Sequence, residues 1–86
     1  MKKTYFILGA KWFDKVNGNT YFNARVIDGE SGETLFYTGF QYGYGSQYAH
    51  EAREQLSKRL GGSYYFNAVD LGSFYMKKRE VKNGWF

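Results

Sequence analysis

Residues 16–28 of the chain read VNGNTYFNARVID, and this stretch determines the fold that the sequence predicts. Asn17-Gly18 is a strong hairpin signal when it stands between two runs of β-favouring residues. Such runs lie on both sides of it, TYFILGAKWF at 4–13 and TYFNARVID at 20–28. The stretch therefore predicts a β-hairpin whose two strands form the centre of an antiparallel sheet.

The chain after this hairpin predicts a third strand and one helix. The turn residues DGESGE at 28–33 lead to the strand-like run TLFYTGFQY at 34–42. Ser46 is a suitable N-cap, and Gly61-Gly62 is typical of a helix end. Between these signals, apolar residues recur with a helical period at Tyr48, Ala49, Ala52, Leu56 and Leu60.

The register of the hairpin decides which side chains face this helix. In the second strand Phe22, Ala24 and Val26 alternate with polar residues, so we expect the even positions to face the core. In the first strand the even positions are again the more apolar set, namely Phe6, Leu8, Ala10 and Trp12. A two-residue turn would place these two sets on opposite faces. We therefore predict a three-residue loop, Asn17-Gly18-Asn19, or a bulge in the first strand.

The last third of the chain predicts a further strand. SYYFNAVDL at 63–71 repeats the YFNA of the second strand, and SFYMKKREV at 73–81 either continues this strand after a bend at Gly72 or forms a fifth one. The predicted fold class is α+β, an antiparallel sheet of four or five strands with one helix packed on one face, in the order β-β-β-α-β. Residues 1–86 are expected to form a single small domain.

Composition and charge narrow the classes of function. The chain holds 9 Tyr, 8 Phe and 2 Trp, more aromatic side chains than so small a core can bury. The net charge of +4 resides at a basic N-terminal end (1–3) and a basic C-terminal end (77–86). No cysteine is present, which excludes disulfides and thiolate sites. Without an apolar run of membrane-spanning length or a secretion signal, we expect a cytoplasmic protein with no membrane partner.

The surplus of aromatic residues predicts a binding surface. If the even positions of the second strand face the helix, Tyr21 and Arg25 point to the opposite, open face of the sheet. Neighbouring strands and the loop YGYG at 42–45 add further tyrosines. Such a surface suits a protein partner, including a second copy of the chain, although the tyrosines could equally pair across strands and only tile the surface. The candidate partner-binding residues are Tyr21, Arg25, Tyr37, Tyr42, Tyr44 and Tyr65.

Two alternative functions rest on other residues. The basic C-terminal end would bind nucleic acid, RNA or DNA, through Lys77, Lys78, Arg79 and Lys82. Gly45 and Ser46 precede the predicted helix, where free backbone N–H groups attract anions. In one interpretation they bind the phosphate of a nucleotide or another small ligand, and the protein acts as a sponge that sequesters this ligand. In the other interpretation they serve only as a glycine turn before the helix.

Residues suited to catalysis are few. His50 is the only histidine and lies beside Glu51, and Asp14, Asp28 and Asp70 are scattered along the chain. Acid–base catalysis needs titratable groups that converge, and a metal site needs several ligands. The sequence therefore predicts a protein that is not an enzyme, with no catalytic residues, no metal site and no cofactor.

Two motifs resemble small, mostly uncharacterised proteins of bacteriophages and prophages. They are VNGNTY at 16–21, with Trp12 and Asp14 before it, and YGYGxxY at 42–48. The resemblance implies a protein of phage type, and many such proteins act stoichiometrically on host machinery. It therefore implies an inhibitor or modulator of a host or phage protein, such as an anti-defence or anti-CRISPR-like protein in the host cytoplasm.

A second resemblance is to the double-stranded RNA-binding domain. That fold also runs through three antiparallel strands into a helix that begins with glycines and a serine. The matching residues are Gly43, Gly45, Ser46, Ala49 and Ala52. Gln47 and Tyr48 stand where that family has phosphate-contacting lysines, and the first helix of the family has no counterpart here.

Overall fold

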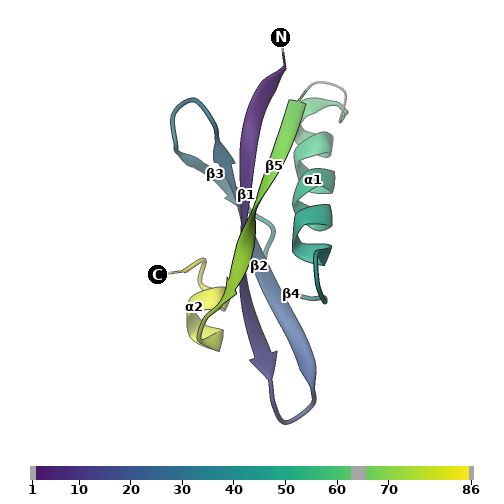
Figure 1. The fold of residues 1–86 in the computed structure, drawn as a ribbon, viewed down its shortest axis with the longest axis vertical. Coiled ribbons are helices and arrows are strands. Elements are labelled where there is room, and N and C mark those ends of the chain that lie inside the picture. The colour runs from purple at the N-terminus through teal and green to yellow at the C-terminus, as the bar shows by residue number, and fades with distance from the viewer. Residues whose placement is uncertain (1, 63–65, 86) are drawn as a thin grey trace.

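The computed structural model describes residues 2–62 and 66–85 and has one mixed five-stranded sheet with a long helix on one face (Figure 1). The strands are β1 (Lys3–Asp14), β2 (Asn19–Asp28), β3 (Thr34–Tyr37), β4 (Gln41–Tyr42) and β5 (Phe66–Tyr75), and the helices are α1 (Gln47–Leu60) and α2 (Lys78–Lys82). The α+β class and the predicted order of the main elements are confirmed.

The sheet has the strand order β3-β2-β1-β5, and β4 pairs with β2. β2 pairs antiparallel with β1, β3 and β4, as predicted, but β5 runs parallel to β1. The reason is the path of α1, which carries the chain across the sheet from the β4 edge to the β1 edge, and such a crossover permits parallel pairing. β5 is therefore an edge strand.

Two predicted strands have different bounds in the structure. The run at 34–42 divides into β3 and β4 because residues 38–40 leave the ladder, with Gly39 at a φ of 95°. β5 continues through Gly72, whose φ is 106°, where the ladder with β1 shifts register. The fifth strand is thus β4, and the segment after Gly72 extends β5 to Tyr75.

The predicted hairpin register is wrong. Four residues, 15–18, connect Asp14 to Asn19, and even positions of β1 pair with odd positions of β2, as in Leu8 with Arg25. The turn is held by the Asp14 carboxylate, whose Oδ1 accepts the N–H of Val16 at 3.0 Å. The odd residues Tyr5 and Ile7 therefore share the α1 face with the even residues of β2 and are buried there.

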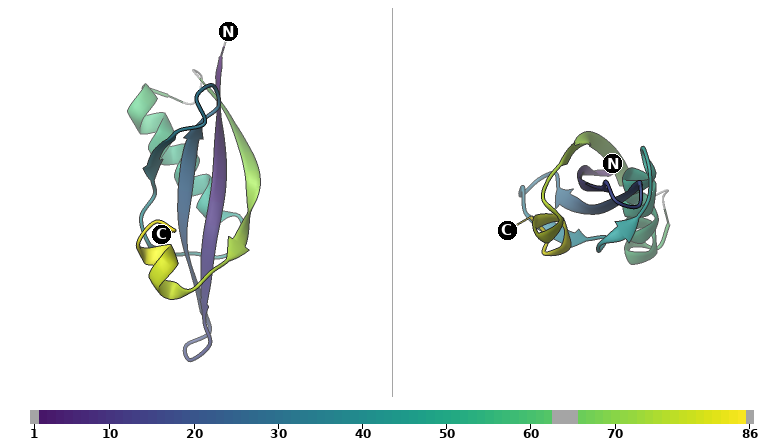
Figure 2. Two further views of the ribbon diagram at one scale, coloured as in Figure 1. Left: turned by 90° about the vertical axis from the view of Figure 1, so that its left-hand side faces the viewer. Right: turned by 90° about the horizontal axis from the view of Figure 1, so that it is seen from below.

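The opposite face of the sheet has its own cover, which explains why both sides of β1 are apolar. α2 and the residues after it pack on this face, as Figure 2 (left) shows. Val81 of α2 is fully buried, and so is Ala10, one of the even residues of β1. The Asn23 side chain donates to the Val81 carbonyl oxygen at 2.8 Å. The described part of the basic C-terminal end is thus a packed helical segment and not a strand.

Helix α1 buries the stripe that the sequence predicts, except that Leu60 is exposed. Gly9 of β1 permits this packing, because a Cβ atom there would lie 2.6 Å from Cδ2 of Tyr48. Gly61 ends the helix in the left-handed region at a φ of 85°. Ser46 is not the predicted side-chain cap, because its hydroxyl makes no capping hydrogen bond.

Tyr48 also links α1 to β5, and this link gives a pH-dependent prediction. Its Oη lies 2.7 and 2.8 Å from the carboxylate oxygens of Asp70. Burial and this hydrogen bond raise the pKa of Tyr48 to about 12 from its usual value of 10.0. The folded state therefore holds the phenolic proton more tightly than the unfolded state. The resulting stabilisation is complete below pH 10 and is lost as the pH rises toward 12.

Chemical denaturation of the wild type and of Tyr48→Phe over this pH range tests the prediction. The wild type should be the more stable protein near neutral pH. This advantage should shrink between pH 10 and 12 by roughly 2 to 3 kcal/mol. Lysine titration affects both proteins alike, so the difference between them isolates Tyr48. Parallel stability curves would show that the Tyr48 hydroxyl does not titrate in this way.

Candidate aromatic binding surface

Five aromatic rings form a continuous row on the sheet face opposite α1, and we call this row the aromatic strip. Ring centroids lie 5.7 Å apart for Trp12 and Tyr21, 5.1 Å for Tyr21 and Phe40, and 5.8 Å for Tyr21 and Tyr42. Tyr44 extends the row, 5.2 Å from Tyr42. The ladder between β2 and β4 creates this row, because it places Tyr21 directly opposite Tyr42.

The two rings at the end of the strip are the accessible ones. Tyr42 is 52% exposed and Tyr44 is 49% exposed, whereas Trp12, Tyr21 and Phe40 are more deeply buried. The Tyr44 hydroxyl lies 3.3 Å from the Gly18 carbonyl oxygen, which fixes its ring over the hairpin turn. A hydrogen bond with Tyr44, together with partial burial, raises the pKa of Tyr42 above its usual value. Tyr42 therefore stays a neutral phenol at physiological pH.

Lysines of α2 lie against the inner part of the strip. Lys78 Nζ is 5.0 Å from the centroid of the Trp12 ring, and Lys82 Nζ is 5.9 Å from that of Phe40. Both distances fall within the range of cation–π attraction. Two of the four predicted nucleic-acid-binding residues therefore adjoin the predicted aromatic surface, and the other two, Lys77 and Arg79, are exposed.

Arg25 and Tyr37 lie on the predicted face but apart from the strip, under a cover that the sequence analysis did not foresee. The guanidinium carbon of Arg25 is 4.4 Å from the centroid of the Trp85 ring and 5.3 Å from that of Tyr37. Arg25 Nη2 donates to the Tyr37 hydroxyl at 3.1 Å. This part of the face is therefore not open, because the C-terminal segment packs on it. Tyr65 lies outside the described residues.

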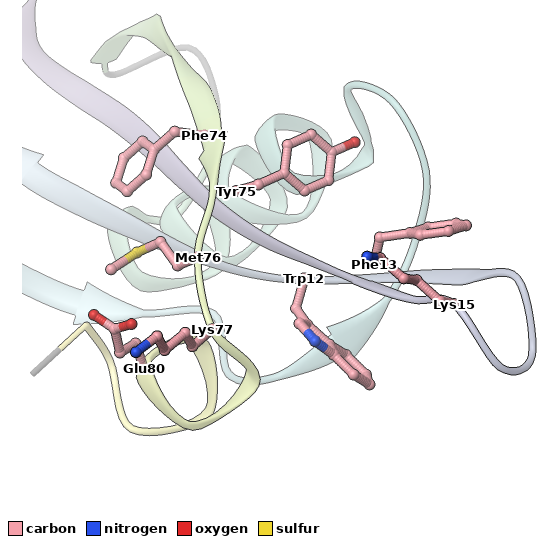
Figure 3. A pocket seen from close by; sticks show the side chains of 8 residues that line it. All are labelled: Trp12, Phe13, Lys15, Phe74, Tyr75, Met76, Lys77 and Glu80. Atoms are coloured by element: carbon pink, nitrogen blue, oxygen red, sulfur yellow. The ribbon is translucent and has the colours of Figure 1, made fainter.

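A shallow groove adjoins the strip at Trp12, where β1 extends beyond the end of β5 (Figure 3). Its volume is about 780 Å³. Four of its eight lining residues are aromatic and three are charged. The lining residues are Trp12, Phe13, Lys15, Phe74, Tyr75, Met76, Lys77 and Glu80.

The loop before α1 carries the predicted anion site. The Gly45 carbonyl oxygen accepts a hydrogen bond from Lys11 Nζ at 2.8 Å, and both Gly45 and Ser46 are exposed. Lys11 also lies 5.2 Å from the centroid of the Tyr48 ring. These contacts show how the loop is held against β1, and anion binding by Gly45 and Ser46 stays a prediction.

The carboxylates considered for catalysis have separate structural partners. Asp14 organises the first turn, where hydrogen bonds from the side chain and backbone of Asn17 and from Val16 lower its pKa. Asp28 forms an ion pair with Lys3 at 2.8 Å, which lowers its pKa, and it also caps the second turn. Asp70 accepts the Tyr48 hydroxyl. The three carboxylates therefore do not converge on one site.

Residues 2–62 and 66–85 hold no cluster of three or more side chains suited to binding a metal ion. None of the helices in this described part of the chain has the length and apolar character needed to cross a membrane. A comparison of the chain with models of protein families, with curated protein sequences and with solved structures finds no match.

Proposed function

We propose that this chain is a non-enzymatic binding protein that contacts a protein partner through the aromatic strip. The exposure of Tyr42 and Tyr44 carries the proposal. A turn into a helix needs glycines but no aromatic rings, and these two rings leave about half of their surface in water. Tyrosine and tryptophan are the residues that most often supply binding energy at protein interfaces.

The arrangement of the rings favours a protein partner over stacked bases. Base stacking needs free ring faces, but Tyr21 and Phe40 are stacked on each other with only 6° between their planes. Lys78 lies over Trp12. The exposed rings of the strip, Tyr42 and Tyr44, each combine an apolar ring with a hydroxyl group, which suits the mixed apolar and polar contacts of a protein interface.

The biological setting of the proposal rests on the resemblance to phage proteins. On that basis the chain inhibits or modulates a host or phage protein by occupying its surface, as an anti-defence or anti-CRISPR-like protein would. The separate structural partners of Asp14, Asp28 and Asp70 support a mode of action without catalysis.

The test is a double variant, Tyr42→Ser with Tyr44→Ser. A tagged protein is used to capture partners from host lysate treated with nuclease, and the affinity for the captured partner is then measured. Loss of two hot-spot rings should weaken binding by about 30-fold or more, which corresponds to about 2 kcal/mol. The matched control is Leu35→Ser, because Leu35 is 47% exposed but lies on β3 outside the strip. Equal affinity of the double variant and the wild type would refute the proposal.

A second candidate function is binding of single-stranded nucleic acid, which the positions of Lys78 and Lys82 beside the strip favour. Affinity for a phosphate backbone falls steeply as salt is raised, because binding releases counterions. Fluorescence anisotropy with a labelled oligonucleotide, measured at low and at physiological salt, tests this function. It predicts a steep loss of affinity with salt and weaker binding by Lys78→Ala with Lys82→Ala. A protein interface would respond little to salt.

A further inference from the structure

The outer edge of β5 is unprotected along its length. Among the described residues no strand pairs with this edge, and seven of the ten residues of β5 are exposed. The strand contains no lysine and no proline, and Asp70 is its only charged residue. Natural proteins usually protect an edge of this length with charges, prolines or a covering segment, because unpaired backbone groups recruit another strand. Within β5 itself the only such devices are the irregularity at Gly72 and the single charge of Asp70.

Exposed apolar side chains border this edge on both faces of the sheet. The exposed fractions are 43% for Val69, 53% for Leu71, 39% for Phe74 and 67% for Tyr75. Phe13, 44% exposed, lines the same groove as Phe74 and Tyr75 and continues the row. Together they expose about 450 Å², taking roughly 200 Å² for each complete ring and somewhat less for each aliphatic side chain.

This area matches what one partner contributes to a stable protein interface. A standard interface buries about 800 Å² on each side, of which a little more than half is non-polar, or about 450 Å². A twofold dimer buries the same surface of each copy, so one edge of this kind meets the requirement for both partners. The edge therefore has the apolar area that pairing with an identical edge needs.

The charges around β5 define the relative orientation of two copies. Lys77 and Lys15 lie beyond the Tyr75 end of β5, and Lys3 lies beside Phe66 at the other end. Parallel pairing would set the Lys77 ends of the two copies side by side. Antiparallel pairing separates them by the length of the strand, roughly 30 Å for ten residues, which far exceeds the screening distance in physiological salt.

Antiparallel pairing also avoids an unpaired lysine at the opposite end. There the Lys77 end of one copy meets the Phe66 end of the other, where Lys3 is already paired with Asp28 at 2.8 Å. The Asp70 carboxylate is bound by the Tyr48 hydroxyl on the α1 face. Near the twofold axis the two copies therefore bring together Val69 and Leu71 with Asp70, whose carboxylate accepts the Tyr48 hydroxyl of its own copy.

We propose that the chain forms a twofold homodimer in which the outer edges of two β5 strands pair antiparallel, so that the two sheets become one continuous sheet. Tyr42 and Tyr44, the exposed rings of the aromatic strip, stay accessible in this dimer, because β4 pairs with β2 and β5 lies on the opposite side of β1. The proposal goes beyond the function proposed above and does not depend on it.

Light scattering coupled to size-exclusion chromatography tests the dimer over a concentration series of about three orders of magnitude centred on the micromolar range. The wild type should approach a mass of about 20 kDa, twice the 10.0 kDa of one chain. Leu71→Lys places a charge at the edge and should raise the dissociation constant at least about tenfold. The matched control is Leu35→Lys on β3, at the opposite edge of the sheet, where the exposed fraction is 47%. This control should still form the dimer.

Hydrogen exchange on the unmodified protein gives a readout that does not depend on the folding of a variant. The backbone amides of β5 should exchange more slowly at high than at low protein concentration, while those of β3 should not change. A wild type of 10.0 kDa at every concentration would overturn the proposal. So would dissociation by Leu35→Lys as readily as by Leu71→Lys, or exchange in β5 that is independent of concentration.

Discussion

We expect the Phe22→Ala variant to lose a large part of the free energy of unfolding of this domain. Phe22 is 1% exposed at the centre of the core, and truncating such a ring costs about 3 to 5 kcal/mol. A domain of this length has roughly 4 to 13 kcal/mol of total stability. The side chain also shapes the approach to α1, since a Cβ atom at Gly43 would lie 2.6 Å from Phe22 Cε2. Its loss therefore affects both the core and the loop that carries Tyr42 and Tyr44.

Urea denaturation followed by circular dichroism measures this effect. Phe13→Ala is the matched control, because the same ring is removed from a side chain that is 44% exposed. The control should lose less than about 1 kcal/mol, as expected for a surface position. Comparable losses in both variants would mean that Phe22 does not anchor the core.

The local part of this fold could be predicted from the sequence. In β2 the alternation of apolar and polar residues indicates that Phe22, Ala24 and Val26 form the buried face. The apolar stripe from Tyr48 to Leu56 indicates a helix. These signals depend on neighbours a few residues apart, so they do not require knowledge of the rest of the chain. The same is true of Gly61, which ends α1 where the sequence indicates.

The long-range part could not be predicted in the same way. The choice of the even residues of β1 as the core face was wrong because both faces of β1 are covered, one by α1 and the other by α2. The second cover comes from residues about 70 positions further along the chain, such as Val81. Local periodicity in the sequence cannot predict such a contact. For the same reason it cannot predict the parallel pairing of β1 with β5.

The candidate site shows the same division. Tyr21, Tyr42 and Tyr44 come together as the sequence suggests, because adjacent β2 and β4 place them on one face. Trp12 and Phe40 were missed, although a correct hairpin register would have placed Trp12 opposite Tyr21. Arg25 was assigned to an open surface because nothing near it in the sequence indicates Trp85, which lies 60 residues later.

Asn23→Ala should cause the largest loss among polar substitutions, because Asn23 joins three segments. The side chain is 3% exposed, donates to the Val81 carbonyl oxygen at 2.8 Å and accepts the Gly39 N–H at 3.1 Å. Removing it leaves two backbone groups without their partner in the interior. Each such loss costs about 1 to 3 kcal/mol, so we expect a loss of roughly 2 to 6 kcal/mol in the free energy of unfolding.

The same substitution should detach α2 before the rest of the protein unfolds, because the side-chain bond to Val81 is one of the few that tie α2 to β2. Hydrogen exchange should then rise at residues 81–85 more than in α1. Asn83→Ala, an exposed change at the end of α2, serves as the control and should alter neither stability nor exchange appreciably. A uniform rise in exchange would instead mean that α2 unfolds with the whole domain. In that case Lys78 and Lys82 could not leave the aromatic strip without loss of the fold.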